Sequence, residues 1–159
     1  MVTREEVWEI AARVCDPEIP VLNIADLGVL RDVHIRGDEI EVEITPTYSG
    51  CPAMNMITLE IETALAQAGF KNVKVSLVLS PAWSTEFMSA QGREKLRAYG
   101  IAPPQKATGR RALFGVEHVA CPRCGSLNTE EIAPFGSTSC KSLWRCLACR
   151  EPFDYFKCH

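Results

Sequence analysis

The sequence predicts an α+β domain over residues 1–101, followed by a small β domain over residues 118–159. Two observations favour this division. In the first part, stretches with a helical hydrophobic period alternate with strand-like stretches, in the order α-β-β-α-β-α. The second part is too short to bury a sufficient core by itself, and it contains two Cys-x-x-Cys pairs. Residues 102–117 begin with Ala-Pro-Pro and show no periodicity, so we expect a linker there.

The first element is a predicted amphipathic helix over residues 3–14. Thr3 and Glu6 have the spacing of a capping box, in which each side chain accepts a hydrogen bond from the other residue's backbone. Apolar residues then recur at helical spacing, at Val7, Ile10, Ala11 and Val14. Pro17 and Pro20 prevent the helix from continuing and stiffen the loop that follows it.

Two strands joined by a tight turn are predicted next. Val33 and Ile35 alternate with polar residues, and residues 39–45 alternate strictly between charged or polar and apolar side chains. Residues 36–38, Arg-Gly-Asp, form the turn between them. We therefore expect a hairpin with one buried face and one face in water.

A second helix is predicted to begin at Pro52 and to end before Gly69, since proline suits the first helical position and glycine the end. Its apolar face contains Met54, Ile57, Ile61, Ala64, Leu65 and Ala68. A third strand follows, with apolar residues at Val73, Val75, Leu77 and Leu79.

The last helix of this domain is predicted to run from a cap at Ser84 to about Tyr99. Trp83 and Met88 have the spacing of a hydrophobic staple around that cap, and Gly100 marks the end of the helix.

Cys51 is a candidate functional residue because it lies at or near the N-cap of the second helix. Unpaired N–H groups and the positive end of the helix dipole both favour the thiolate, which is the form that attacks or binds metal. The alternative is a small buried residue that packs between strand and helix, as cysteines often do.

Acidic residues in the loops give weaker signals. Asp16 and Glu18 lie in the proline-stiffened loop, where their carboxylates could serve as metal ligands or hydrogen-bond acceptors. The alternative is that the loop is a turn that ends the helix and that both acids are solvated. Asp26 is expected to cap a turn through its side-chain oxygen. No Ser–His–acid set and no phosphate-binding glycine loop is evident, so the sequence gives little support for catalysis.

The four cysteines of the second domain have the spacing of a metal site. Cys121 and Cys124 form one pair, Cys146 and Cys149 the other, and twenty-one residues between the pairs leave room for a hairpin. Such turns direct four thiolates at one tetrahedral ion, and we expect structural zinc. An iron–sulfur cluster also takes four thiolates, so it stays an alternative. Cys140, Cys158 and His159 exceed this ligand set and are candidates for packing, ligand replacement or a second site.

Composition limits the partners. The net charge is −3, and residues 112–159 contain five Lys or Arg and five Asp or Glu. Binding to nucleic acid usually needs a basic face, so we expect none. No apolar run approaches the ~20 residues of a membrane span. The charged start is unlike a secretory leader and the Cys-x-x-Cys pairs favour metal over disulfide, so a cytoplasmic protein is expected.

Several motifs resemble a known family. Residues 16–20 (Asp-Pro-Glu-Ile-Pro), 24–28 (Ile-Ala-Asp-Leu-Gly) and 49–52 (Ser-Gly-Cys-Pro) look like the small iron–sulfur assembly domain family, which includes SufT-type factors. The tail, with Phe-Gly-Ser-Thr at 135–138 and Glu-Pro-Phe-Asp-Tyr-Phe at 151–156, narrows the resemblance to the PaaD family. Members of that family are accessory subunits of bacterial phenylacetyl-CoA epoxidase.

The resemblance implies a non-catalytic role in phenylacetate degradation. The epoxidase uses a di-iron oxygenase and a reductase with flavin and an iron–sulfur cluster. A PaaD-like protein would assist assembly of one of these centres through Cys51, with Asp16 as the second functional position. It could also bind an iron–sulfur cluster itself, stably or in passing. The alternative is a structural subunit that bridges oxygenase and reductase without metal transfer. Whether the chain also forms a homo-oligomer is open.

Overall fold

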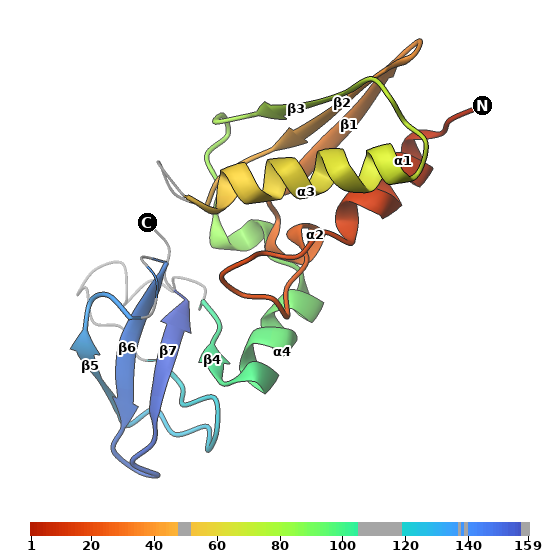
Figure 1. Ribbon diagram of the computed structural model, residues 1–159. Helices are drawn as coiled ribbons and strands as arrows, with labels where there is room; N and C mark the ends of the chain where they lie inside the picture. Colours follow the sequence, from red (N-terminus) through yellow and green to blue (C-terminus); the bar gives the residue numbers. More distant parts are fainter. Residues whose placement is uncertain (48–51, 105–118, 137, 139, 157–159) are drawn as a thin grey trace. The chain divides into compact units, whose positions relative to one another are not determined.

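The structure, a computed structural model, describes residues 1–47, 52–104, 119–136, 138 and 140–156 (Figure 1). The chain divides into two compact units, Met1–Gly92 and Arg93–His159. Both units combine β-strands with helical segments, so the predicted α+β class is confirmed. Within the described residues, no helix is long and apolar enough to cross a membrane.

The first unit contains a three-stranded sheet in the order β1-β2-β3. Strands β1 (Leu30–Arg36) and β2 (Glu39–Ile44) form the predicted antiparallel hairpin, and β3 (Val73–Leu77) pairs parallel with β2. Alternate residues of β2 are buried, at Ile40, Val42 and Ile44. The hairpin therefore has one face in the core and one toward water, as the alternation predicts.

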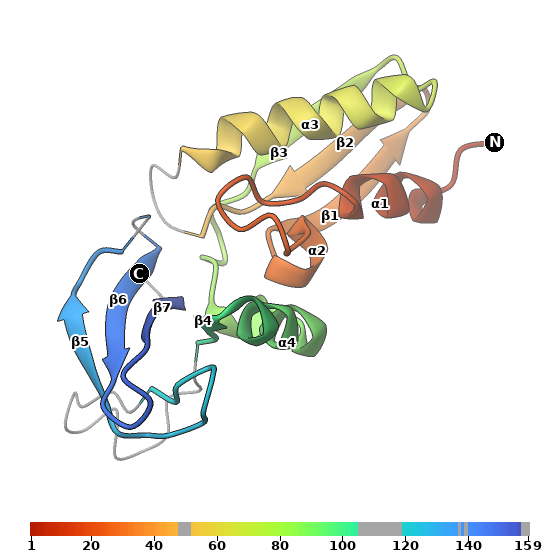
Figure 2. The same ribbon diagram turned by 60° about the horizontal axis from the view of Figure 1, so that its bottom comes forward.

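Two helices cover the buried face of this sheet (Figures 1 and 2). Helix α1 (Arg4–Ala12) begins with the predicted capping box: the Thr3 hydroxyl accepts from the Glu6 N–H at 3.2 Å, and the Glu6 carboxylate from the Thr3 N–H at 3.0 Å. Helix α3 (Ala53–Gln67) contacts α1 and β3. Its buried stripe matches the predicted face at Met54, Ile57, Ile61 and Leu65.

The third strand is shorter than its hydrophobic pattern predicts. Leu77 ends β3 and is 56% exposed, and Leu79 lies beyond it and is 68% exposed. Strand β3 lies at an edge of the sheet and contacts α3. The predicted third strand is confirmed over Val73–Leu77, and Leu79 lies outside it.

The single helix predicted from Ser84 to Tyr99 is also wrong, because the segment forms two pieces. Ser84 caps a 3₁₀ turn, η1 (Thr85–Phe87), after which Met88 is extended with ψ 131°. Helix α4 (Ala90–Tyr99) starts separately, and the Ser89 hydroxyl accepts from the Gly92 N–H at 2.9 Å. Ser84 and Ser89 can each cap the start of a helix. Hydrogen bonds to another part of the chain determine where the helices form.

Those tertiary bonds come from a short helix that the sequence did not predict, α2 (Ile24–Leu27). The Ser89 N–H donates to the Asp26 carbonyl at 2.9 Å, and the Ser89 hydroxyl to Asp26 Oδ1 at 3.1 Å. The indole N–H of buried Trp83 donates to the Leu27 carbonyl at 2.9 Å. Asp26 thus fixes the segment after β3, a larger role than the turn cap expected from the sequence.

The second unit contains a four-stranded sheet in the order β4-β7-β6-β5. Strands β5 (Thr129–Ala133), β6 (Lys141–Cys146) and β7 (Pro152–Phe156) are antiparallel neighbours. Strand β4 (Ile101–Ala102) pairs parallel with β7. The contacts therefore divide the chain after Gly92, ahead of the boundary at residue 101 expected from the sequence, because β4 joins this sheet.

The second unit has a hydrophobic core beside its cysteine turns. Among the described residues, one cluster of this core contains Ala102, Val119, Cys121, Trp144, Cys146, Phe153 and Tyr155. Trp144 and Tyr155 meet edge to face, with ring centroids 5.9 Å apart. Two members of the cluster, Cys121 and Cys146, also belong to the Cys-x-x-Cys pairs, so core and candidate metal site share residues.

Candidate metal centre

The first Cys-x-x-Cys pair lies in a turn before β5. The Cys121 N–H donates to the Ser126 carbonyl, and the Gly125 N–H to the Cys121 carbonyl, both at 2.9 Å. Gly125 has φ 76°, a left-handed conformation that glycine adopts without a steric penalty. The glycine after the second cysteine thus lets the chain turn back around Cys124.

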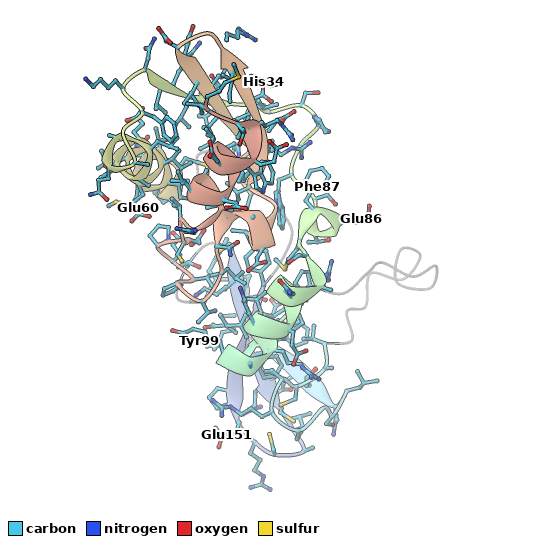
Figure 3. All side chains as sticks on the ribbon, turned by 90° about the vertical axis from the view of Figure 1, so that its right-hand side faces the viewer. His34, Glu60, Glu86, Phe87, Tyr99 and Glu151 are labelled. Atoms are coloured by element: carbon cyan, nitrogen blue, oxygen red, sulfur yellow. The ribbon has the colours of Figure 1, made fainter. Side chains whose placement is uncertain are left out.

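The second pair forms a matching turn between β6 and β7. The Cys146 N–H donates to the Glu151 carbonyl at 3.0 Å, the same five-residue spacing as in the first turn. The Cys149 N–H points at the Cys146 sulfur, 3.4 Å away. Arg150 follows the second cysteine and has φ 64°, so this turn takes the left-handed conformation without glycine. Figure 3 labels Glu151, just after this turn.

The two turns bring four sulfur atoms together. One sulfur from each of Cys121, Cys124, Cys146 and Cys149 lies within 4.8 Å of all the others. Across the turns, Cys121 and Cys149 are 3.8 Å apart and Cys124 and Cys146 are 3.5 Å apart. Zinc–sulfur bonds of about 2.3 Å in a tetrahedron place sulfurs about 3.8 Å apart. The arrangement fits one tetrahedral ion.

The thiols of the second turn differ in acidity. The backbone N–H of Cys149 is the main cause that lowers the pKa of Cys146 to about 6. The Glu151 backbone lowers the pKa of Cys149, but burial and the neighbouring sulfurs outweigh this and raise it to about 12. The backbone N–H groups of this turn therefore stabilise negative charge on the Cys146 sulfur. Gathering four negative sulfurs needs a cation.

The auxiliary candidates divide into described and undescribed residues. Cys140 is buried, and its sulfur lies 3.0 Å from the Thr138 hydroxyl. Among the described residues it does not belong to the four-sulfur group. Cys158 and His159 lie outside the described residues, so their predicted auxiliary roles stay predictions.

Asp16 lies in the first unit and organises its own loop. It is buried, and its carboxylate accepts from the N–H groups of Glu18 at 2.7 Å and Ile19 at 3.0 Å. Its own N–H donates to the Leu22 carbonyl at 2.9 Å. The side chain therefore holds the Asp-Pro-Glu-Ile-Pro turn closed, and a functional role for Asp16 beyond this stays a prediction.

Cys51 lies outside the described residues, but both ends of its segment are described. Before it, the Thr45 hydroxyl donates to the Val78 carbonyl at 2.7 Å, and the Thr45 N–H to the Val29 carbonyl at 2.8 Å. After it, Pro52 occupies the N-cap of α3 with helical angles, φ −68° and ψ −20°. No described side chain caps this helix and its first turn contains no acid. The residue preceding Pro52 thus borders a helix start whose positive end is not neutralised by those side chains.

Comparison with known proteins covers nearly the whole chain. Residues 4–77 match the family model "Iron-sulfur cluster assembly protein", and residues 105–157 match "PaaD zinc beta ribbon domain". An Escherichia coli (strain K12) protein, named as a candidate component of 1,2-phenylacetyl-CoA epoxidase, is 49% identical over 153 residues. That similarity spans 96% of this chain and 92% of the relative. The chain belongs to the PaaD family.

Solved structures resemble the N-terminal part of this PaaD chain. A DUF59 domain from Bacillus anthracis is 26% identical with a TM-score of 0.55, covering 58% of this chain and 90% of that one. A conserved hypothetical protein from Thermotoga maritima is 35% identical with a TM-score of 0.51, covering 60% and 94% respectively. The resemblance expected from the sequence motifs is confirmed, for the assembly-type domain and for the PaaD ribbon.

A second polar group was missed by the sequence analysis. Asp32 and His34 of β1 and Glu43 of β2 offer ligand atoms within 4.8 Å of one another. The alternation of β1 places Asp32 and His34 on the wet face, but only the pairing register puts Asp32 opposite Glu43. No sequence motif marks such a cross-strand group.

Proposed function

We propose that this protein is a non-catalytic accessory factor that helps to mature a metal centre of a phenylacetyl-CoA epoxidase. The observation that carries this proposal is the combination of two parts in one chain. One part is an iron–sulfur-assembly-type domain with Cys51 before the uncapped start of α3. The other is a four-cysteine ribbon of the PaaD type.

In this proposal, Cys51 is the group that carries iron or a cluster on its way to the client. The unneutralised helix start favours its thiolate, which is the form that binds iron. Thr45 is bound to the Val78 and Val29 carbonyls, which holds the residue from which this segment departs. The Asp16 carboxylate closes the turn of a second family motif. A single thiolate suits transfer, because a cargo bound by few ligands can exchange to the client's ligands.

The ribbon would hold structural zinc rather than a cluster. In a four-iron cluster each cysteine binds a different iron, so the sulfurs lie farther apart than around a single ion. The separations of 3.5 and 3.8 Å favour a single ion, and four thiolates without an open position favour a closed structural site. Cys121, Cys124, Cys146 and Cys149 are the proposed ligands.

The proposed partners are the oxygenase and reductase components of the epoxidase, since the Escherichia coli relative is named as a subunit of that enzyme. The cytoplasmic location expected from the sequence stays a prediction. So does the expectation that nucleic acid is not a partner.

The test is the iron content of the client proteins. Oxygenase and reductase are purified from cells that produce the wild type, Cys51→Ser or Cys15→Ser. Cys15 is an exposed thiol whose loss serves as the matched control. We expect Cys51→Ser to lower the iron per client while Cys15→Ser leaves it unchanged. Normal iron loading with Cys51→Ser would contradict the proposal.

A structural subunit that bridges oxygenase and reductase is the second candidate. Exposed apolar side chains at and after the edge strand β5 favour it, at Ile132 (52% exposed) and Phe135 (62% exposed). A bridging subunit would co-purify with both components at fixed stoichiometry and would tolerate Cys51→Ser. Ile132→Ser would then release it from the complex.

A further inference from the structure

The solvent-facing side of the β1–β2 hairpin contains a group of side chains of types that can bind metal. This group is separate from the four cysteines. Asp32, His34 and Glu43 lie on the side of the sheet opposite to buried Val33 and Val42. His34 is labelled in Figure 3 on this hairpin. The imidazole Nε2 lies 3.2 Å from Glu43 Oε1, and all three side chains offer an atom within 4.8 Å of the others.

The register places two carboxylates directly opposite each other. Asp32 pairs with Glu43 across the strands, and like charges in that arrangement repel. The neighbouring carboxylate, Glu41, accepts a hydrogen bond from the Ser76 hydroxyl at 2.7 Å. It also forms ion pairs with Arg36 at 3.6 Å and with Lys74 at 4.0 Å. Among the described ion pairs, the Asp32–Glu43 pair has one permanently charged neighbour.

That neighbour, Arg4, leaves half of the Asp32 carboxylate available. Arg4 Nη2 lies 2.5 Å from Asp32 Oδ1, and the Val33 N–H donates to the same oxygen at 2.8 Å. Among the described interactions, Oδ2 of Asp32 and Oε2 of Glu43 accept no hydrogen bond. The two carboxylates and the Arg4 guanidinium together have a net charge of −1.

We propose that Asp32, His34 and Glu43 bind a divalent first-row transition ion such as Mn²⁺ or Fe²⁺. One imidazole nitrogen and two carboxylate oxygens suit these ions, and water would complete the coordination. Bonds of about 2.1 Å would bring the ligand atoms to about 3 Å from one another. The three side chains are each between one quarter and two fifths exposed, so they have room to close by that amount.

Manganese is the probe that separates this site from the ribbon. Soft thiolate ligands favour zinc, whereas carboxylates and imidazole accept Mn²⁺, so Mn²⁺ does not displace zinc from four thiolates. Amide spectra of the zinc-loaded full chain are recorded while Mn²⁺ is added. We expect the paramagnetic ion to broaden the amides of residues 32–34 and 41–43 first, with saturation at one ion per chain.

Three variants distinguish coordination from general attraction of cations. Glu43→Gln and Glu39→Gln make the same charge change on β2, but only Glu43 belongs to the group. His34→Gln removes the imidazole ligand and leaves both carboxylates in place. Because loss of a group that only supports a ligand costs 10–100-fold in affinity, we expect Glu43→Gln and His34→Gln to weaken Mn²⁺ binding at least about tenfold.

Glu39→Gln should change the affinity by less than about twofold, since it stays outside the group. If Glu39→Gln and Glu43→Gln weaken Mn²⁺ binding equally, the ion is attracted by surface charge alone, and the proposal is overturned. An affinity unchanged by His34→Gln, or hairpin amides that do not broaden at millimolar Mn²⁺, would also overturn it. The unperturbed amides of the other strands confirm in each variant that the sheet is folded.

Discussion

Loss of one ribbon cysteine should unfold the second unit and leave the first folded. The perturbation is Cys146→Ala, which removes a sulfur that is fully buried and belongs both to the four-sulfur group and to the core. The control is Cys15→Ala, an exposed thiol in the first unit. Chelation of zinc from the wild type is the same perturbation without a sequence change.

The magnitude follows from the size of the core. The second unit, Arg93–His159, is short, and the core of a domain of that length rarely supplies more than about 3–5 kcal/mol. Zinc bound to structural cysteines contributes about 10–16 kcal/mol near neutral pH. Metal binding therefore exceeds the expected contribution of the hydrophobic core, and a site with three ligands and a cavity should not stay folded.

The assay is the dispersion of backbone amide signals. In Cys146→Ala we expect signals of residues 119–156 to collapse to unfolded positions, while those of α1, β1, β2 and α3 keep theirs. Trp144, 5% exposed and packed on Tyr155, should become solvent-exposed. A dispersed ribbon spectrum in the metal-free protein would refute the inference that the metal is structural.

Two further predictions concern the first unit. In urea unfolding, Gly28→Ala should destabilise the first unit much more than Gly37→Ala. Both glycines have positive φ, which costs an L-residue about 1–2 kcal/mol. Only at Gly28 would the added Cβ also lie 2.5 Å from an atom of η1. Equal losses would show that η1 does not pack there. Arg4 lowers the pKa of Asp32 chiefly through their hydrogen bond. The pair therefore stabilises the folded protein at pH values above the pKa that Asp32 has in the unfolded chain. This stabilisation is lost as the pH falls through the lower pKa of the folded state. Arg4→Gln should thus reduce stability slightly at neutral pH and not in acid, and a loss equal at both pH values would contradict the pairing.

Features determined by nearby residues were predictable from the sequence. The capping box of Thr3 and Glu6, the β1–β2 hairpin and the helical face of α3 each depend on spacings within one element. The two Cys-x-x-Cys turns are local in the same way, and their spacing predicted the four-sulfur group.

Features determined by distant residues were not predictable. Helix α4 starts just after Ser89, and Asp26, far away in the chain, binds that serine. Strand β4 pairs with β7 across more than fifty residues. The sequence therefore assigned Ile101 to the end of the first domain and Ala102 to the linker, and predicted no strand there. Arg150 takes a left-handed conformation where the matching position of the first turn has Gly125. The turn geometry outweighs local preference there.

The candidate sites were also predictable only where they depend on nearby residues. The sequence placed Cys51 beside the start of α3, and the structure adds that this start has no capping side chain among the described residues. The Asp32–His34–Glu43 group depends on strand register, which alternation alone does not provide.

If this protein acts only while the epoxidase matures, as we propose, the finished enzyme should work without it. The most direct measurement is the epoxidase activity of oxygenase and reductase that were produced together with this protein, before and after its removal by an affinity tag. The account predicts that activity and iron content persist without it, and that components produced with Cys51→Ser have low iron throughout. Loss of activity on removal, restored by adding back either wild type or Cys51→Ser, would contradict the account and identify a bridging subunit.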